Sequence, residues 1–274
     1  MSPHPDQPSL RWPGPLSATL QRQLFALVEP YDPVMMNCRQ MALPGVIYIH
    51  HGSLAVMFSN TEMDASLGVI LGPGDWFGYQ TLSLQPTQFF AFVEPLSPVD
   101  AYVLPQAKLQ RLAENEPEVY KFLYFIGNRI HTSNLQLLLN SLHDLTSRLV
   151  YLLFELARSQ PKVANAEWTL TISQQQLSFI SGISRPRINQ ILKRLERDGE
   201  IRTQRGKIVI RDLQALQARI NQVNLMFRDP RKLIPSTGHQ RIRRRQRGAG
   251  TKVAAASQSP SDGMRAGIIP QHRR

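Results

Sequence analysis

The sequence predicts an α+β chain in three parts: an antiparallel β barrel or jelly roll, a long helix, and a C-terminal winged helix-turn-helix. Three observations predict it. Several short strand-like runs, bounded by glycine and proline, follow one another closely within residues 46–104. A helical period then continues for about 55 residues from Pro105. Finally, residues 171–212 read as two short helices joined by a glycine turn, followed by a β hairpin.

The formal net charge of +12 is unevenly distributed along the 274 residues. It amounts to −5 over residues 1–116, +5 over 173–212 and +10 over 228–274. Positive charge in the C-terminal half favours a polyanionic partner there and a different role for the front of the chain. Residues 228–274 predict a basic, disordered tail, which either adds non-specific attraction to phosphates or is a dispensable extension.

Cysteine content and hydropathy exclude several classes of protein. One cysteine, Cys38, allows neither an internal disulfide nor a thiolate-rich metal cluster within one chain. No apolar run reaches the ~20 residues that span a bilayer, and the N-terminus does not read as a signal peptide. We therefore expect a cytoplasmic protein with no membrane partner. Because adjacent strand residues point to opposite faces, His50 and His51 cannot ligate one metal together, and we expect no metal and no cofactor.

The front of the chain begins with an irregular lead, residues 1–15, and continues as a domain over residues 16–116. Leucines recur at intervals of four, four and three residues over 16–27, which predicts one face of a short helix. Strand-like runs follow at 46–49, 54–58, 68–71, 89–93 and 99–104, whereas residues 31–44 read only weakly as strand.

A long helix over residues 117–143 is expected to pair with a second copy of the chain. Its apolar residues recur at alternating intervals of four and three, the pattern of a coiled-coil seam, in which a polar residue fixes register. The alternative, a helix packed against its own domain, stays open because neighbouring positions are apolar as well. The predicted seam consists of Val119, Leu123, Ile126, Ile130, Ser133, Leu137 and Asn140.

The C-terminal domain is expected over residues 144–227, starting with a helix that Pro161 stops. Ser173 is a predicted N-cap, Gly182 supplies a turn with positive φ, and Ser184 caps a second helix over 185–197. Pro186 is tolerated at the second helical position, where its missing N–H would have no intrahelical partner. The following β runs meet at Arg205-Gly206 and form a wing.

A winged helix with a basic second helix reads duplex DNA, because this helix fits the major groove while the wing contacts phosphates. Arginine at the helix start suits a bidentate contact to guanine, and the amides of asparagine and glutamine can read adenine. The predicted base contacts are Arg185, Pro186, Asn189 and Gln190. The predicted phosphate contacts are Ser173, Gln174, Ser184, Arg187, Lys193, Arg205 and Lys207.

This order of parts resembles the Crp/Fnr family of bacterial transcription regulators over about residues 16–215. Leu71–Gly78 is similar to the glycine-rich turn before the family's effector pocket, and Ile183–Glu196 to its recognition helix. The resemblance implies a cyclic-nucleotide-binding-like jelly roll in front. It also implies a homodimer that binds a near-palindromic site on double-stranded DNA and engages RNA polymerase. It places the effector pocket at Gly74, Trp76, Phe77, Gly78, Tyr79, Phe89 and Phe90.

Departures from the family's pattern bear on the effector. Members that bind cyclic AMP have a glutamate after the last glycine of the turn and an Arg-Ser pair on a later strand. Here Tyr79 follows Gly78, and residues 88–93 hold no basic residue. Because a phosphate in an apolar cleft needs a cation or several donors, we expect no control by cyclic AMP and leave the effector unknown. Cys38 also cannot replace the four cysteines of the oxygen-sensing branch.

We therefore expect a sequence-specific DNA-binding transcription regulator and not an enzyme. Two alternatives stay open. A cupin-like β-barrel metalloenzyme requires clustered His and Glu ligands on strands, where only His50 and His51 occur. A DNA-packaging protein acting through charge alone would bind every duplex alike, which a well-formed recognition helix argues against.

Overall fold

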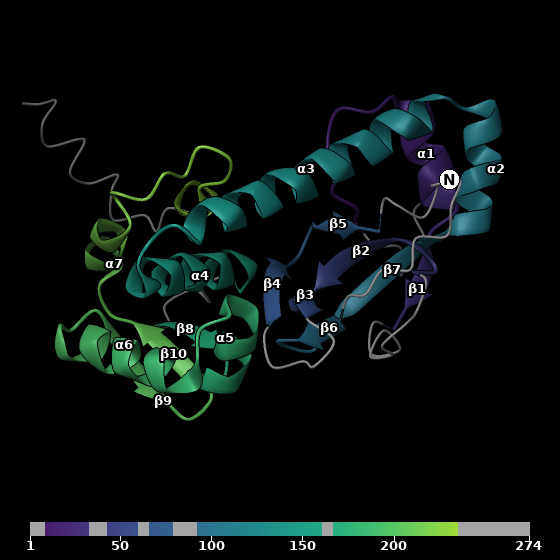
Figure 1. Cartoon of the computed structure of the whole chain (residues 1–274). Helices are drawn as coiled ribbons and strands as arrows, with labels where there is room; N and C mark the ends of the chain where they lie inside the picture. Colours follow the sequence, from purple (N-terminus) through teal and green to yellow (C-terminus); the bar gives the residue numbers. More distant parts are fainter. Residues whose placement is uncertain (1–8, 33–42, 60–65, 79–91, 161–166, 235–274) are drawn as a thin grey trace, which may run out of the picture. The chain divides into compact units, whose positions relative to one another are not determined.

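Two antiparallel sheets form the front of the chain in the computed structural model, which describes residues 9–32, 43–59, 66–78, 92–160 and 167–234 (Figure 1). One sheet has the strand order β1-β7-β2-β5 and the other β4-β3-β6. The strands are β1 Glu29–Tyr31, β2 Gly45–His51, β3 Leu54–Ser59, β4 Ser66–Leu71, β5 Trp76–Phe77, β6 Phe92–Pro95 and β7 Asp100–Pro105.

Alternation along these strands creates two apolar faces. β3 pairs with β4 along its whole length, with Leu54 opposite Leu71 and Ala55 opposite Ile70. Leu54 and Leu71 pack into a core that contains side chains from both sheets. Ala55 and Ile70 lie on the opposite face and pack with side chains of the C-terminal half. The predicted α+β class with an antiparallel β domain in front is confirmed.

Most of the predicted strand runs coincide with observed strands. The runs at 46–49, 54–58 and 68–71 lie within β2, β3 and β4. The run at 99–104 overlaps β7 from Asp100 on, and the run at 89–93 overlaps β6 at its described residues. Strands β1, with 3 residues, and β5, with 2, were not predicted, because so few residues show no alternation.

The N-terminal lead packs closely against the front domain. Helix α1, Ala18–Ala26, starts at the cap Ser17 and buries Leu20 and Leu24 completely, as the leucine spacing predicted. Ahead of it, Trp12 stacks on Trp76 with ring centroids 5.7 Å apart. The Trp76 indole N–H donates to the Arg11 carbonyl oxygen at 2.6 Å. Residues 9–15 therefore cover the strand β5 residue Trp76.

The predicted helical stretch is divided into α2 Gln106–Asn115, α3 Glu118–Asn140 and α4 Leu145–Ser159. Pro117 precedes the first residue of α3, and Asp144 caps α4 by accepting from the backbone N–H of Thr146 and Ser147. No helix in the described ranges is long and apolar enough to cross a membrane.

The predicted seam on α3 faces the chain's own core. Five of its members, Val119, Leu123, Ile126, Ser133 and Asn140, are between 0% and 8% exposed within a single chain. The first three join a core with α1, β2 and α2. The alternative, a helix face packed on its own domain, therefore describes these residues, and their assignment to a contact with a second copy is wrong. The remaining two, Ile130 and Leu137, are half-buried.

The C-terminal half is a winged helix. Helices α5 Gln174–Ser181 and α6 Arg185–Arg197 are followed by the strands β9 Ile201–Gln204 and β10 Lys207–Ile210. An unpredicted strand, β8 Trp168–Thr171, completes the sheet order β8-β10-β9. Helix α7 Leu213–Arg219 and the 3-10 turn η3 Pro230–Leu233 follow. We call residues 221–234 the C-terminal strap, because they return to contact α3 and α4.

Candidate nucleic-acid interface

The two helices of the helix-turn-helix are held by local hydrogen bonds. Ser173 forms a capping box: its hydroxyl accepts from the Gln176 backbone N–H at 3.1 Å, and its own N–H donates to Gln176 Oε1 at 3.0 Å. Gly182 ends α5 with φ of 66°, a left-handed conformation that favours glycine. The predicted cap and turn are both confirmed.

Helix α6 is divided cleanly between an apolar and a basic face. Ile188, Ile191, Leu192 and Leu195 are at most 8% exposed and pack into the C-terminal core. Pro186 occupies the first turn, as predicted from its missing N–H. On the outward side, the exposed residues are Ser184, Arg185, Pro186, Arg187, Gln190, Lys193, Arg194 and Arg197, with Asn189 half-buried. The predicted base-reading side chains therefore share one surface.

The wing adds a second cluster of exposed cations. β9 and β10 pair from Ile201 opposite Ile210 to Gln204 opposite Lys207, so the turn falls at Arg205-Gly206 as predicted. Arg205 and Lys207 are both exposed. Arg202, also exposed, donates to the Glu167 carboxylate at 2.8 Å. Arg205 and Lys207 thus have the placement that a phosphate contact from the wing requires.

Two of the predicted phosphate contacts differ in their local bonding. The Ser173 hydroxyl is engaged in the capping box, whereas Ser184 is the N-cap residue of α6 but makes no side-chain cap bond. The predicted N-cap position of Ser184 is therefore confirmed, although its hydroxyl forms no capping bond. Gln174 is exposed at the first position of α5. Arg187 is exposed and donates to Gln190 Oε1 at 3.1 Å.

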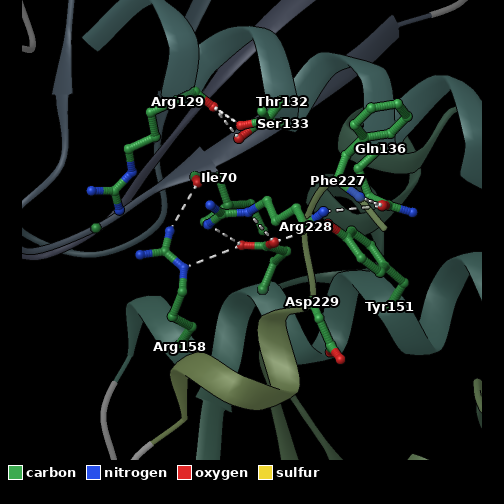
Figure 2. Close-up of polar contacts among 12 residues, drawn as sticks. Ile70, Arg129, Thr132, Ser133, Gln136, Tyr151, Arg158, Phe227, Arg228 and Asp229 are labelled. Atoms are coloured by element: carbon green, nitrogen blue, oxygen red, sulfur yellow. Dashed lines mark hydrogen bonds and ion pairs between the residues drawn. The ribbon is translucent and has the colours of Figure 1, made fainter. Parts of the chain in front are cut away.

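Buried ion pairs connect the winged helix to the front of the chain. Glu155 on α4, 6% exposed, accepts from Arg228 of the strap at 2.6 and 3.0 Å and from Arg158 at 3.2 Å (Figure 2). Arg158 also donates at 2.9 Å to Asp75, which precedes β5. Asp75 accepts in addition from Arg129 on α3. One connected set of charges thus joins the strap, α4, α3 and the glycine-rich turn.

The charges in this set remain ionised. Burial alone would raise the pKa of the Glu155 carboxyl, but Arg228 and Arg158 outweigh that effect and hold the pKa below its usual range. Burial opposes ionisation of Asp75 in the same way. Arg158, Arg129 and the Gly72 backbone N–H, which donates at 2.9 Å, hold the Asp75 pKa low as well. Sequence reasoning missed this set, because its members lie far apart along the chain.

The glycine-rich turn lies directly against α4. A Cβ added at Gly72 would lie 2.7 Å from the Ser159 Cβ, so only glycine fits at this approach. Gly74 and Gly78 both have φ of 90°.

Two residues of the predicted effector pocket, Trp76 and Phe77, lie in a filled interior. Trp76 is 1% exposed, because Trp12, Tyr48 and Phe122 surround its ring, and Phe77, 5% exposed, packs with the core of the β strands. Both are core residues here, so the predicted pocket is filled at these two positions, and their role toward an effector stays a prediction. Tyr79, Phe89 and Phe90 lie outside the described residues. Within the part that is described, no group of three His, Cys, Asp or Glu is placed to hold a metal.

Comparison with known proteins agrees with this architecture. Residues 147–219 match the family model of the Crp-like helix-turn-helix domain. The cAMP-activated global transcriptional regulator CRP of Pasteurella multocida is 24% identical over 165 residues, which cover 60% of this chain and 78% of that protein. The HTH-type transcriptional regulator Cmr of Mycobacterium tuberculosis is 27% identical over 205 residues, covering 74% and 78%.

Solved structures show the same fold. A Crp/Fnr-family regulator from Eubacterium rectale superposes with a TM-score of 0.58 at 16% identity, covering 74% of this chain and 94% of that one. The c-di-GMP responsive global regulator CLP of Xanthomonas campestris gives 0.55 at 20% identity, covering 71% and 99%. Fold and interface thus define a winged helix-turn-helix DNA-binding protein with an N-terminal β domain. Residues 147–219 match a Crp-like helix-turn-helix domain, and the chain is similar to transcription regulators of the Crp/Fnr family, as the sequence resemblance implied.

Proposed function

We propose that the chain is a homodimer that recognises a near-palindromic duplex site through α6 and regulates transcription together with RNA polymerase. The observation that supports this most directly is the outward face of α6. Its N-terminal turn exposes Arg185, Pro186 and Arg187, while its apolar side is fixed in the core. A helix held in this way presents its first turn to base edges in the major groove.

Specific roles follow from the chemistry of each side chain. Arg185 would bond guanine in bidentate fashion, Asn189 and Gln190 would read adenine, and Pro186 would contact a base edge beside them. The remaining predicted residues would hold phosphates and set the register of the protein on the duplex. We propose these phosphate contacts for Ser173, Gln174, Ser184, Arg187, Lys193, Arg205 and Lys207.

Selection of bound duplexes from a random pool by the full chain tests this proposal. Relative to the unaltered chain on the selected duplex, Arg185→Ala should lose about 1–3 kcal/mol at one position of each half-site and relax the preference there. Lys207→Ala should weaken binding to all duplexes about equally and lower the salt dependence. Arg22→Ala, a change at an exposed arginine of α1, serves as the control. Identical effects of the first two changes on every duplex would refute the assignment.

The proposed contact between two copies lies on the outward face of α3. Tyr120 is 60% exposed, Tyr124 66% and Leu138 64%, and Leu142 just beyond the helix is 80% exposed. With Asn128, His131 and Leu135 between them, these positions recur at intervals of four and three, as in a coiled coil. This register replaces the inward one. A dimer of this kind would set half-sites about 34 Å apart, or a multiple of that distance.

Leu138→Glu should therefore convert the dimer to a monomer in analytical ultracentrifugation and weaken binding to the two-half-site duplex. Leu233→Glu makes the same change at another exposed leucine, 48% exposed on η3, and should leave the mass unchanged. A monomeric unaltered chain at tens of micromolar, or a dimeric Leu138→Glu variant, would contradict this arrangement.

We also propose a division of labour along the chain. Residues 16–116 act as the sensor, 117–143 as the dimer helix and 144–227 as the DNA-binding domain, with 1–15 as lead. The predicted start of the disordered tail at residue 228 is wrong, because residues 228–234 belong to the C-terminal strap. We propose a basic tail over residues 235–274. We propose that the protein works in the cytoplasm and that cyclic AMP is not its effector. Adding cyclic AMP should leave its melting temperature and DNA affinity unchanged, since a ligand that binds the native state must raise its stability.

A further inference from the structure

A pocket lies where the edge strand β4, the helices α3, α4 and α5, and the strap meet. Its empty space, open mouth included, is about 620 Å³. Because this volume includes open solvent at the mouth, the enclosed space is smaller, about 70 Å³, and suits a small ligand or one end of a longer one. Its walls include Leu67, Leu137, Leu152 and Ile180, so most of the lining surface is apolar. Eight of the fifteen residues that line this junction pocket are nevertheless polar or charged, and the bonding of Glu155, Arg148 and Asn140 decides which ligand charge fits.

Glu155 offers no further acceptor capacity to the pocket. Its Oε1 accepts from the Tyr151 hydroxyl and Arg228 Nε, and its Oε2 accepts from Arg158 Nε and Arg228 Nη2. A carboxylate has about four acceptor positions, and these four bonds use them. The negative charge in the pocket is thus already matched by Arg228 and Arg158.

Arg148 supplies a cation without a matching carboxylate. This half-buried residue of α4 lines the pocket and donates through Nη2 to the Ser181 carbonyl oxygen at 3.0 Å. Throughout the described ranges, no carboxylate lies within ion-pair distance of its guanidinium. A guanidinium has five N–H donors and always carries its charge, so Arg148 has further donors for a ligand.

Asn140 adds a buried donor whose orientation is fixed by its neighbour. Gln136 Oε1 accepts from the backbone N–H of Phe227 and Arg228, which assigns its Nε2 as the donor to Asn140 Oδ1 at 2.9 Å. The Asn140 amide nitrogen is thereby directed away from Gln136. It has no hydrogen-bond partner among the residues that the structure describes, although Asn140 is only 4% exposed and lines the pocket. An unpaired buried donor in a native structure calls for a partner.

We propose that the junction pocket binds a small monocarboxylate with an apolar body. The carboxylate would bond the guanidinium of Arg148 and the amide N–H of Asn140, and the apolar body would lie against Leu137, Leu152 and Ile180. One unmatched cation balances one negative charge, which favours a monoanion over a multiply charged phosphate. The Glu155 carboxylate has no free acceptor position, whereas Arg148 and Asn140 offer donors, so an anionic ligand fits better than a cationic one.

The position of the pocket gives such a ligand a means of regulation. The ligand would contact β4 of the front domain and α4 and α5 of the winged helix at once, and α5 supports the recognition helix. By binding one relative arrangement of these elements more tightly than another, it would change the affinity for DNA. This consequence, unlike binding itself, rests on the proposed function.

Octanoate is the probe, and 1-octanol is its uncharged counterpart. With the full chain at low millimolar ligand, we expect saturable heat of binding for octanoate. We also expect a melting temperature higher by about 3 °C or more at ten times its Kd. 1-Octanol should bind at least tenfold more weakly. Absence of octanoate binding, or equal binding of the two probes, overturns the proposal, because the charge then has no role.

Variants locate the site. Arg148→Gln should weaken octanoate binding at least tenfold, and Asn140→Leu, which removes the donor, should weaken it as well. Arg111→Gln, a change at an exposed arginine of α2, is the matched control and should bind like the unaltered chain. Circular dichroism of each variant checks folding, and Arg148→Gln retains most of the side chain if Asn140→Leu fails to fold. Unchanged binding in Arg148→Gln would overturn the assignment.

DNA binding separates this proposal from the proposed function. If the full chain binds octanoate but no selected duplex, the pocket assignment holds and the DNA-reading assignment fails. If it binds the selected duplex but not octanoate, the opposite is true. A change of DNA affinity with saturating octanoate that disappears in Arg148→Gln supports regulation through this pocket.

Discussion

The buried bond between the strap and α4 gives the sharpest test of the structure's energetics. Arg228, with a side chain 12% exposed, donates twice to Glu155 and is attached to the rest of the chain through a strap that follows the last helix. Arg228→Met keeps most of the apolar stem and removes only the charge and the donors. The change leaves the buried Glu155 carboxylate with Arg158 and Tyr151 as partners.

Breaking one side of a buried ion pair costs about 3–5 kcal/mol, because the remaining charge stays out of water. Two partners remain on Glu155, so we expect the lower end, about 3 kcal/mol. For a chain of this size, that loss corresponds to a melting temperature lower by about 6–12 °C. Urea unfolding at pH 7 with the full chain measures the difference directly.

Two further variants distinguish a buried charge from general damage. Arg202→Met breaks the pair with Glu167, in which both side chains are 48% exposed, and should cost less than about 1 kcal/mol. Adding Glu155→Gln to Arg228→Met removes the buried charge and should restore part of the lost stability. An Arg228→Met variant no less stable than Arg202→Met, or a double variant no more stable than Arg228→Met alone, would refute this reasoning.

Two other predictions concern acid stability and helix capping. Asp75 and Glu155 have folded pKa values below their ordinary 3.8 and 4.5. The stability that their ionised forms give to the folded chain is therefore complete above these ordinary values. It is lost as the pH falls below them and through the lower folded pKa values. The melting temperature should therefore be flat from pH 7 to about 5.5 and fall steeply below about pH 4.5, and a flat profile down to pH 3 would contradict it. Ser173→Ala should cost about 1 kcal/mol in urea unfolding because it removes the capping bond. Ser184→Ala, whose hydroxyl makes no such bond, should cost about 0.5 kcal/mol or less, and equal losses would argue against the capping box.

The winged helix was predictable from sequence because its determinants are local. A cap at Ser173, a glycine at 182, an apolar stripe on α6 and a turn at Arg205-Gly206 all act within a few residues of one another. Each signal agrees with the next, which is why the order of elements could be deduced before the contacts between them. Strand β8 was not predicted, because its four residues, with Trp168 and Leu170 buried, give too short an alternation to be recognised.

The long helix shows what periodicity leaves undetermined. Alternating intervals of four and three mark an apolar face, but they do not say whether that face meets the same chain or a second copy. Val119 and Ile126 turned out to be fully buried within the chain, while Tyr124 and Leu138 face outward. The contact between the strap and α4 could not be predicted from the sequence either, because Arg228 and Glu155 are 73 residues apart in the chain.

The stacked rings of Trp12 and Trp76 provide a spectroscopic consequence. The chain contains three tryptophans, and two of them lie nearly parallel at 14° with the N-terminal lead on one side and β5 on the other. Trp76 is 1% exposed beneath this stack, so departure of the lead brings water to its ring and shifts its fluorescence emission to longer wavelength. Detachment of the lead from the β strands can therefore be followed in real time, with no attached dye.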